Sequence, residues 1–244
     1  MCFSATASFT AGAALVAVGV LTLRRATRIV EIPYAAIPLL FGLQQLIEGG
    51  LWLTFAKTSH LNEILTHIYA LFSHVIWPVF VPLAVLILER VRWRRAVLTA
   101  LAISGASAGF YLLYFWAVDP TTSRVVGQHI IYDSPHFYIV PILVLYVLST
   151  CLSSLVSSDP AIRWFGAASL ASYVFASAFY SVWFISVWCF FAAVMSGTVW
   201  LYFRRPHRWN GSKPRASTSR SRRQRSVKVE NPVQKAPAKS GHRA

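Results

Sequence analysis

Long apolar stretches alternate with short polar gaps along the whole chain. A helix needs about 20 mostly apolar residues to cross a hydrocarbon core about 30 Å thick. Seven stretches approach or reach that length. We therefore predict an all-α, polytopic membrane protein, a seven-transmembrane-helix bundle over residues 1–205. The predicted spans are residues 8–23, 33–55, 65–88, 96–117, 137–155, 162–179 and 183–203.

Arginines gather in every second gap. The second and fourth gaps hold only Lys57 and Arg124 as basic residues. Cytoplasmic loops carry the excess of Lys and Arg, so this alternation predicts an N-terminus outside and a cytoplasmic C-terminus in the cell (inner) membrane. The arginines in the odd gaps and at the end of the last span are Arg24, Arg25, Arg28, Arg90, Arg92, Arg94, Arg95, Arg163, Arg204, Arg205 and Arg208.

Most of the basic charge lies in the last segment. Of the 23 Lys and Arg residues, 13 follow Phe203, against one acid, Glu230. Residues 206–244 have few large apolar side chains, so we expect a disordered basic cytoplasmic tail. Such a tail is attracted to anionic lipid head groups. The high pI therefore does not indicate a specific nucleic-acid partner. The alternative is a solvated tail without a partner.

The N-terminus does not resemble a cleaved signal, because the bases follow the first apolar stretch and do not precede it. The first span is thus expected to remain as an anchor. The cysteines Cys2, Cys151 and Cys189 form no metal-ligand spacing. We interpret Cys151 and Cys189 as small buried residues. Removal of Met1 would make Cys2 a candidate nucleophile, although no base or oxyanion pattern accompanies it.

Two local patterns concern helix packing. Residues 162–203 contain no Pro and, apart from Arg163, no charge, yet one continuous helix would be about 60 Å long. Two helices joined by a tight turn near residues 180–182 fit better. Gly105 and Gly109 form a small-xxx-small face that favours close helix approach.

The acid deepest inside a predicted span is Glu48. A charge near the centre of a spanning helix is costly, so Glu48 should be protonated, paired or in contact with water. His74 in the third span lies at a similar depth from the outer surface. We predict that Glu48 and His74 interact, either as a structural hydrogen bond or as part of an outward-facing polar pocket.

Several neighbours of this pair add polar groups or distort the helices. Amide groups lie one turn below Glu48, glycines follow it directly, and two prolines follow His74. A proline four residues after His74 removes the N–H that would bond the His74 carbonyl. These residues are Gln44, Gln45, Gly49, Gly50, Pro78 and Pro82.

The remaining histidines lie mostly near the predicted outer surface. His60, His67 and His74 recur every seven residues, a spacing that suits a water path along one helix face. Glu63, four residues before His67, is a possible partner for it. A metal site built from Glu48, His74 and one loop histidine stays open, without a spacing signature.

The long outer loop over residues 119–136 supplies His129, Asp133 and His136 as further candidates. Ser134 is expected to cap the fifth span, with Pro135 as its first helical residue.

Three segments carry a resemblance: Met1-Cys2-Phe3-Ser4-Ala5-Thr6-Ala7-Ser8-Phe9, Gln44-Gln45-Leu46-Ile47-Glu48-Gly49, and Ser73-His74 with Trp77-Pro78. In these the chain resembles an uncharacterised family of bacterial integral membrane proteins of unknown function. The resemblance covers the seven spans and leaves out the tail. It implies a membrane location and no established activity.

Other seven-helix families can be tested against the residues. A microbial rhodopsin needs a lysine in the last span, and no Lys occurs between Lys57 and Lys213. Ceramidase-like hydrolases use a zinc site of several histidines, whereas spans six and seven contain no His. No catalytic or cofactor motif stands out, so the sequence disfavours an enzyme.

The best functional class from the sequence is a membrane protein that binds or transports a small solute, ion or proton through the outward-facing pocket. One alternative is a metal-assisted membrane hydrolase at the outer face. Another is a non-catalytic scaffold whose tail binds lipid.

Overall fold

A computed structural model describes residues 4–55, 60–119, 121–179 and 184–204. The chain divides into a unit spanning Met1–Pro206 and one spanning His207–Ala244. The sequence-based predictions for the tail, for Cys2 and for the turn at residues 180–182 fall outside the described residues.

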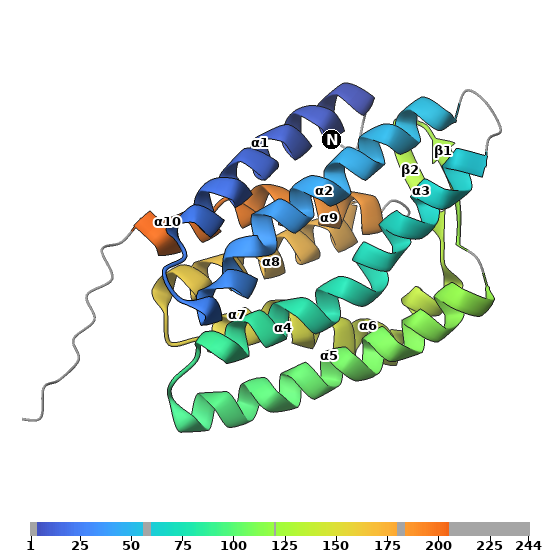
Figure 1. The fold of residues 1–244 in the computed structure, drawn as a ribbon. Coiled ribbons are helices and arrows are strands. Elements are labelled where there is room, and N and C mark those ends of the chain that lie inside the picture. Colours follow the sequence, from blue (N-terminus) through green and yellow to red (C-terminus); the bar gives the residue numbers. More distant parts are fainter. Residues whose placement is uncertain (1–3, 56–59, 120, 180–183, 205–244) are drawn as a thin grey trace, which may run out of the picture. The chain divides into compact units, whose positions relative to one another are not determined.

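The described chain is almost entirely helical (Figure 1). Two π-helical segments, Leu71–Ile76 and Leu148–Leu152, join α3 to α4 and α6 to α7. Short 3-10 helices cover Ile29–Glu31 and Pro135–Tyr138. The helices are α1 Ala5–Arg25, α2 Ile32–Thr54, α3 His60–Ala70, α4 Trp77–Leu88, α5 Arg92–Val118, α6 Val140–Val147, α7 Ser153–Val156, α8 Pro160–Phe179, α9 Phe184–Ser196 and α10 Val199–Arg204.

Among the described residues, five helical runs are long and apolar enough to cross a membrane: Ala5–Arg25, Ile29–Thr54, His60–Leu88, Arg92–Val118 and Phe184–Arg204. This fits the predicted all-α, multi-pass membrane protein. The count differs from seven because the fifth predicted span corresponds to a shorter apolar helix, Val140–Val156, and α8 is not among the five.

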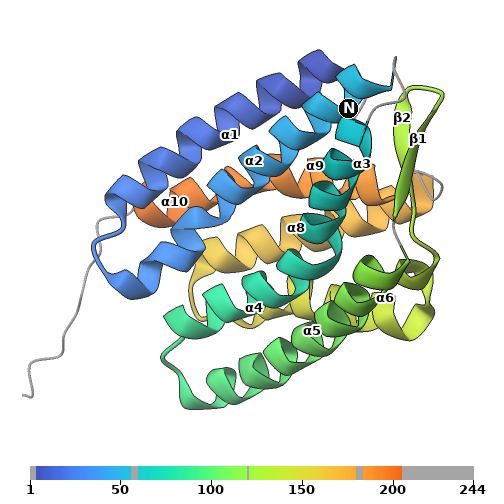
Figure 2. The same ribbon diagram turned by 45° about the vertical axis from the view of Figure 1, so that its right-hand side comes forward.

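The loop predicted between the fourth and fifth spans forms a β-hairpin. Strands β1, Thr122–Val126, and β2, His129–Asp133, pair antiparallel. Gly127 in the turn has φ 66°, a left-handed conformation that glycine adopts without a steric penalty. The hairpin lies at one end of the helical bundle beside α3 (Figure 2).

Side chains dock the hairpin onto α3. The Tyr132 ring stacks on Tyr69 with centroids 4.4 Å apart, and the Thr66 and Ser123 hydroxyls are 2.7 Å apart. These contacts give the hairpin a defined position relative to α3.

Within the described residues, the apolar run of residues 162–203 includes helices α8 and α9. Helix α8 covers Pro160–Phe179 and α9 covers Phe184–Ser196. The two pack together through Tyr173 and Trp188, whose ring centroids are 5.4 Å apart. The Trp188 indole also donates to the Ser169 carbonyl at 3.4 Å.

Glycines bring α1 and α2 together. A Cβ on Gly12 would lie 3.0 Å from the Gly42 carbonyl oxygen, and one on Gly42 would lie 3.0 Å from the Gly12 oxygen. A Cβ on Gly19 would overlap the backbone of Leu39. Each helix thus presents bare backbone to the other, the arrangement that favours close packing in a membrane.

The predicted small face of α5 is confirmed. A Cβ on Gly105 would overlap the Pro78 carbonyl oxygen and would lie 2.8 Å from Ser149 Cβ. A Cβ on Gly109 would lie 2.8 Å from Val79. Gly105 therefore marks the place where α5 crosses α4 and the π-helical segment Leu148–Leu152.

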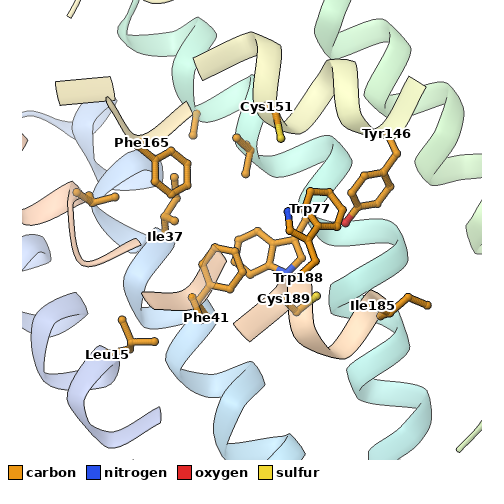
Figure 3. Packing of buried hydrophobic residues seen from close by; sticks show 14 of the residues in the cluster. Leu15, Ile37, Phe41, Trp77, Tyr146, Cys151, Phe165, Ile185, Trp188 and Cys189 are labelled. Atoms are coloured by element: carbon orange, nitrogen blue, oxygen red, sulfur yellow. The ribbon is translucent and has the colours of Figure 1, made fainter. Parts of the chain in front are cut away.

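Aromatic side chains fill the middle of the bundle (Figure 3). Trp77 stacks on Phe41 with centroids 3.7 Å apart, and Tyr146 meets Trp188 edge to face at 5.5 Å. A cavity of about 30 Å³, with apolar walls, lies among these rings. Its volume is close to that of one water molecule.

At the end away from the hairpin, Glu89 and Arg94 join the α4–α5 and α7–α8 connections. The Glu89 carboxylate accepts the Ser158 N–H at 2.7 Å and the Val91 N–H at 3.0 Å. Arg94 donates to the Ser157 carbonyl at 2.6 Å. Burial by itself raises the pKa of Glu89, but the backbone N–H groups bind the carboxylate more strongly and hold this pKa below its usual value.

We predict that Gly105→Ala destabilises the protein by about 1–3 kcal/mol, because the added methyl group meets backbone that cannot rotate away. Gly50→Ala is the matched control. A Cβ there lies 3.3 Å from the movable Leu65 side chain, and alanine favours a helix by up to ~1 kcal/mol. Thermal unfolding in detergent measures both variants. Equal unfolding temperatures for the two would contradict the proposed crossing point.

Candidate functional site

The π-helical segment Leu71–Ile76 arranges the backbone around His74. The Trp77 N–H donates to the Phe72 carbonyl, five residues back, and not to Ser73. In this register the next donor for the Ser73 carbonyl would be residue 78, a proline without an N–H. The Tyr146 hydroxyl of α6 donates to that carbonyl at 2.5 Å. The sequence-based expectation concerned the neighbouring His74 carbonyl, whose α-helical donor would also be residue 78.

The His74 side chain is buried but incompletely hydrogen-bonded. Its Nδ1 lies 2.7 Å from the Ser73 hydroxyl, and its ring packs on Phe137 with centroids 4.7 Å apart. The residue is 4% exposed, and within the described chain its Nε2 has no hydrogen-bond partner. An unpaired polar atom at this depth is costly unless a ligand or water meets it.

His74 lines a cavity of about 320 Å³, the outer cavity, between α5, the hairpin and the 3-10 helix Pro135–Tyr138. Its walls combine carboxylates, imidazoles, hydroxyls and aromatic rings. The described lining residues are His74, Leu112, Phe115, Trp116, Asp119, Thr121, Thr122, Asp133, Ser134, Pro135, His136 and Phe137.

The charged groups of the outer cavity already have neighbours. Arg124 binds Asp133 through two contacts, Nε to Oδ2 at 3.1 Å and Nη2 to Oδ1 at 3.3 Å. His136 Nε2 lies 3.6 Å from Asp119 Oδ2, and the His136 ring stacks on Phe115 with centroids 3.5 Å apart. The cavity therefore holds one carboxylate paired with a guanidinium and another beside an imidazole.

Ser134 and Pro135 differ in part from their predicted roles. Pro135 does begin a helix, the 3-10 segment, but α6 starts only at Val140. The Ser134 side chain makes no capping bond and lies instead 3.1 Å from the Thr121 hydroxyl. Thr121 precedes β1 and Ser134 follows β2, so this contact closes the base of the hairpin over the cavity.

Glu48 lies elsewhere in the bundle and is fully buried. Ser186 of α9 donates to Glu48 Oε1 at 2.6 Å, and Gln45 donates to Oε2 at 3.3 Å. No Glu48–His74 hydrogen bond occurs within the described chain, and Glu48 is not among the residues that line the outer cavity. Glu48 joins α2 to α9, whereas the π-helical turn directs His74 toward Phe137.

The neighbours of Glu48 also hold helices together. Gln44 accepts the Trp77 indole N–H at 2.7 Å, which links α2 to α4. Gly49 faces Phe9 of α1, and Gly50 faces Leu65 of α3. These glycines provide helix contacts where the sequence suggested open space beside Glu48. Pro82 is a buried residue inside α4.

The other histidines are spread over the hairpin end. The Glu63 carboxylate pairs with His60 at 3.1 Å. Glu63 meets His67, the partner suggested by the sequence, through its backbone oxygen, 3.2 Å from His67 Nδ1. The wider π-helical turns interrupt the seven-residue alignment of His67 and His74. His129 in β2 is buried, and burial lowers its pKa.

Within the described ranges, no group of three or more His, Cys, Asp or Glu residues is placed to hold a metal ion. The site suggested from Glu48, His74 and a loop histidine is therefore not assembled there. Glu48 is directed toward α9, and His74 toward the hairpin end.

Sequence reasoning missed three residues of these sites: Ser186, Tyr146 and Asp119. Ser186 and Tyr146 are single hydroxyls in apolar runs, and their partners lie far away in the chain. Asp119 directly follows α5, and its position at the start of the outer loop was the available signal.

A family model described as a family of unknown function, DUF6629, matches residues 1–216. The chain belongs to this family. No curated protein and no solved structure matches it. Membership agrees with the uncharacterised family that the sequence motifs suggested and assigns no activity to this DUF6629 chain.

We predict that Glu48 is energetically coupled to Ser186. Glu48→Leu removes the acceptor and Ser186→Ala removes the donor of a buried hydrogen bond, and each change costs about 1–3 kcal/mol. The double variant should cost less than the sum of the two, because either single change already breaks the Glu48–Ser186 hydrogen bond. Unfolding free energies in detergent measure the cycle. Strict additivity would show that the contact contributes no coupling.

Proposed function

We propose that this family member is an integral membrane protein that binds or transports a small solute, ion or proton through the outer cavity. We further propose seven membrane crossings in the cell (inner) membrane, with the N-terminus and the hairpin outside. On this topology the basic tail lies in the cytoplasm and contacts anionic lipid head groups.

The observation that carries the proposal is that buried His74, whose Nε2 has no hydrogen-bond partner within the described chain, is one of the residues that line the outer cavity. A volume of about 320 Å³ lies at the small end of the range for ligand sites. A buried polar atom without a partner is costly, and a small polar solute that reaches this nitrogen from the cavity would supply the missing hydrogen bond.

Two packing contacts support the proposed orientation. Arg25 lies 4.5 Å from the Trp200 ring centroid, and Arg94 binds the carbonyl groups of Val156 and Ser157. They connect α1 with α10 and α5 with the α7–α8 connection, so arginine-bearing segments gather at the end away from the hairpin (Figure 1). A shared basic end is what the positive-inside rule requires of the cytoplasmic side.

The metal-assisted hydrolase is less well supported. It needs at least three convergent ligands, and the described residues bring no such group together. A scaffold without a ligand site gives no reason for a cavity lined by a buried histidine, two carboxylates and aromatic rings.

The topology is tested by cysteine labelling on intact cells, in a background without Cys2. We expect Thr122→Cys, exposed on the hairpin, to react with an impermeant thiol reagent. Ser158→Cys, exposed at the other end, should react only after permeabilisation. Ser158 is preferable to Ser157, because Ser157 is buried and would be protected on either side. The reverse order of labelling would overturn the orientation.

Solute binding is tested by thermal unfolding of the full-length protein in a panel of small cations, anions and neutral polar solutes. A ligand at 100 times its Kd stabilises the folded state by about 2.7 kcal/mol. We expect His74→Phe to abolish this stabilisation, because it keeps a ring against Phe137 and removes the acceptor. His67→Phe, the same change on α3 outside the cavity lining, should retain it. Equal responses of both variants would contradict the proposed site.

A further inference from the structure

We propose that the outer cavity selects a small organic cation that carries an ammonium group. This inference rests on the proposed function and names the class of solute. It follows from the charge of the cavity wall, from its hydrogen-bonding character and from its aromatic surface.

The described wall of the outer cavity is acidic. It includes Asp119 and Asp133 and contains no Lys or Arg. Arg124, outside this lining set, already binds both oxygens of Asp133. Asp119 lies 3.6 Å from His136, and no Lys or Arg of the described chain pairs with it. Asp119 is therefore the carboxylate left to balance a positive charge, and an anionic solute would meet repulsion from it.

The deepest polar group of the wall accepts a hydrogen bond. The Ser73 hydroxyl donates to the Ala70 carbonyl at 3.3 Å, so its oxygen is free to accept the proton on His74 Nδ1. A neutral imidazole protonated at Nδ1 presents a lone pair at Nε2. Nε2 is the ring nitrogen without a partner in the described chain, and His74 lines the cavity, so we match it with a solute that brings a donor.

The remaining wall suits the carbon body and the charge of such a solute. Phe115, Trp116 and Phe137 contribute rings, and Leu112 adds an aliphatic side. Aromatic faces attract cations, most strongly where water is excluded. A carboxylate, a lone-pair acceptor and aromatic rings together recognise an ammonium with a short carbon chain. A carboxylate of the same length carries a negative charge in place of the positive one, and an alcohol carries no charge.

Three probes of the same length test the charge requirement: n-propylammonium, propionate and 1-propanol. Each is titrated calorimetrically into the full-length protein in detergent, at constant ionic strength. We expect saturable binding of n-propylammonium and no saturable binding of the other two. Asp119→Asn and His74→Phe should each weaken n-propylammonium binding by about tenfold, since a hydrogen bond to a charged group contributes at least that factor.

Glu63→Gln is the matched control for Asp119→Asn. It is the same acid-to-amide change at the hairpin end, on an exposed side chain outside the cavity lining, and it should leave the affinity for n-propylammonium unchanged. Equal weakening by Glu63→Gln would mean that only the general negative charge of this end attracts the probe, and the proposed site would be wrong.

The other outcomes separate this inference from the proposed function. Saturable, His74-dependent binding of propionate or 1-propanol, without n-propylammonium, would overturn the cation class and leave the proposed solute site standing. Absence of saturable n-propylammonium binding would overturn the cation inference by itself. If the solute panel also fails to stabilise the protein, the proposed function fails as well.

Discussion

The bundle depends on how the backbone carbonyl groups near Pro78 obtain hydrogen bonds without water. Within a bilayer an unpaired carbonyl has no solvent to bond, so a proline in a spanning helix requires a substitute donor. The helix responds by widening to a π register over Leu71–Ile76, which leaves the Ser73 carbonyl without an N–H. The Tyr146 hydroxyl of α6 then donates to that carbonyl. One missing N–H thus explains the local helix type and the contact between α6 and the α3–α4 run.

Other features of the fold follow from the same crossing. The carbonyl group of Pro78 lies against Gly105, so α5 approaches at a distance that no larger residue permits. Toward the hairpin, the π-helical turn carries His74 to Phe137, where its Nδ1 is paired with Ser73 and the residue joins the lining of the outer cavity. Helix packing and the candidate site therefore share one cause, and a change at Gly105 is expected to disturb both.

The buried polar side chains of Glu48 and His74 differ in their surroundings. Glu48 receives hydrogen bonds from Ser186 and Gln45, so protein groups bind both of its oxygens and it holds α2 against α9. The Nε2 of His74 has no partner within the described chain, and His74 lines a cavity that Asp119 and Asp133 also line. Gln44 Nε2 and Gln45 Oε1 beside Glu48 are unpartnered there as well, so the missing hydrogen bond does not distinguish the two surroundings. The cavity does, because His74 lines it and Glu48 does not, and this difference makes His74 the candidate.

The sequence by itself determined the membrane character, the helical class, the small face at Gly105 and Gly109, and the disturbance at Pro78. Each of these depends on local composition or on a residue's own backbone chemistry, which neighbours in space do not alter. Asp133, His136 and His74 were also recognised as candidates, because polar groups near or within apolar spans are costly. Their grouping was not recognised, since it requires the hairpin docked on α3 and a π-helical turn in front of Pro78. Only the tertiary structure decided that Glu48 meets Ser186, 138 residues away, because helices of similar depth and composition offer many equivalent pairings. The choice among them follows from close packing at Gly12, Gly42 and Gly105, which depends on the shapes of both partners at once.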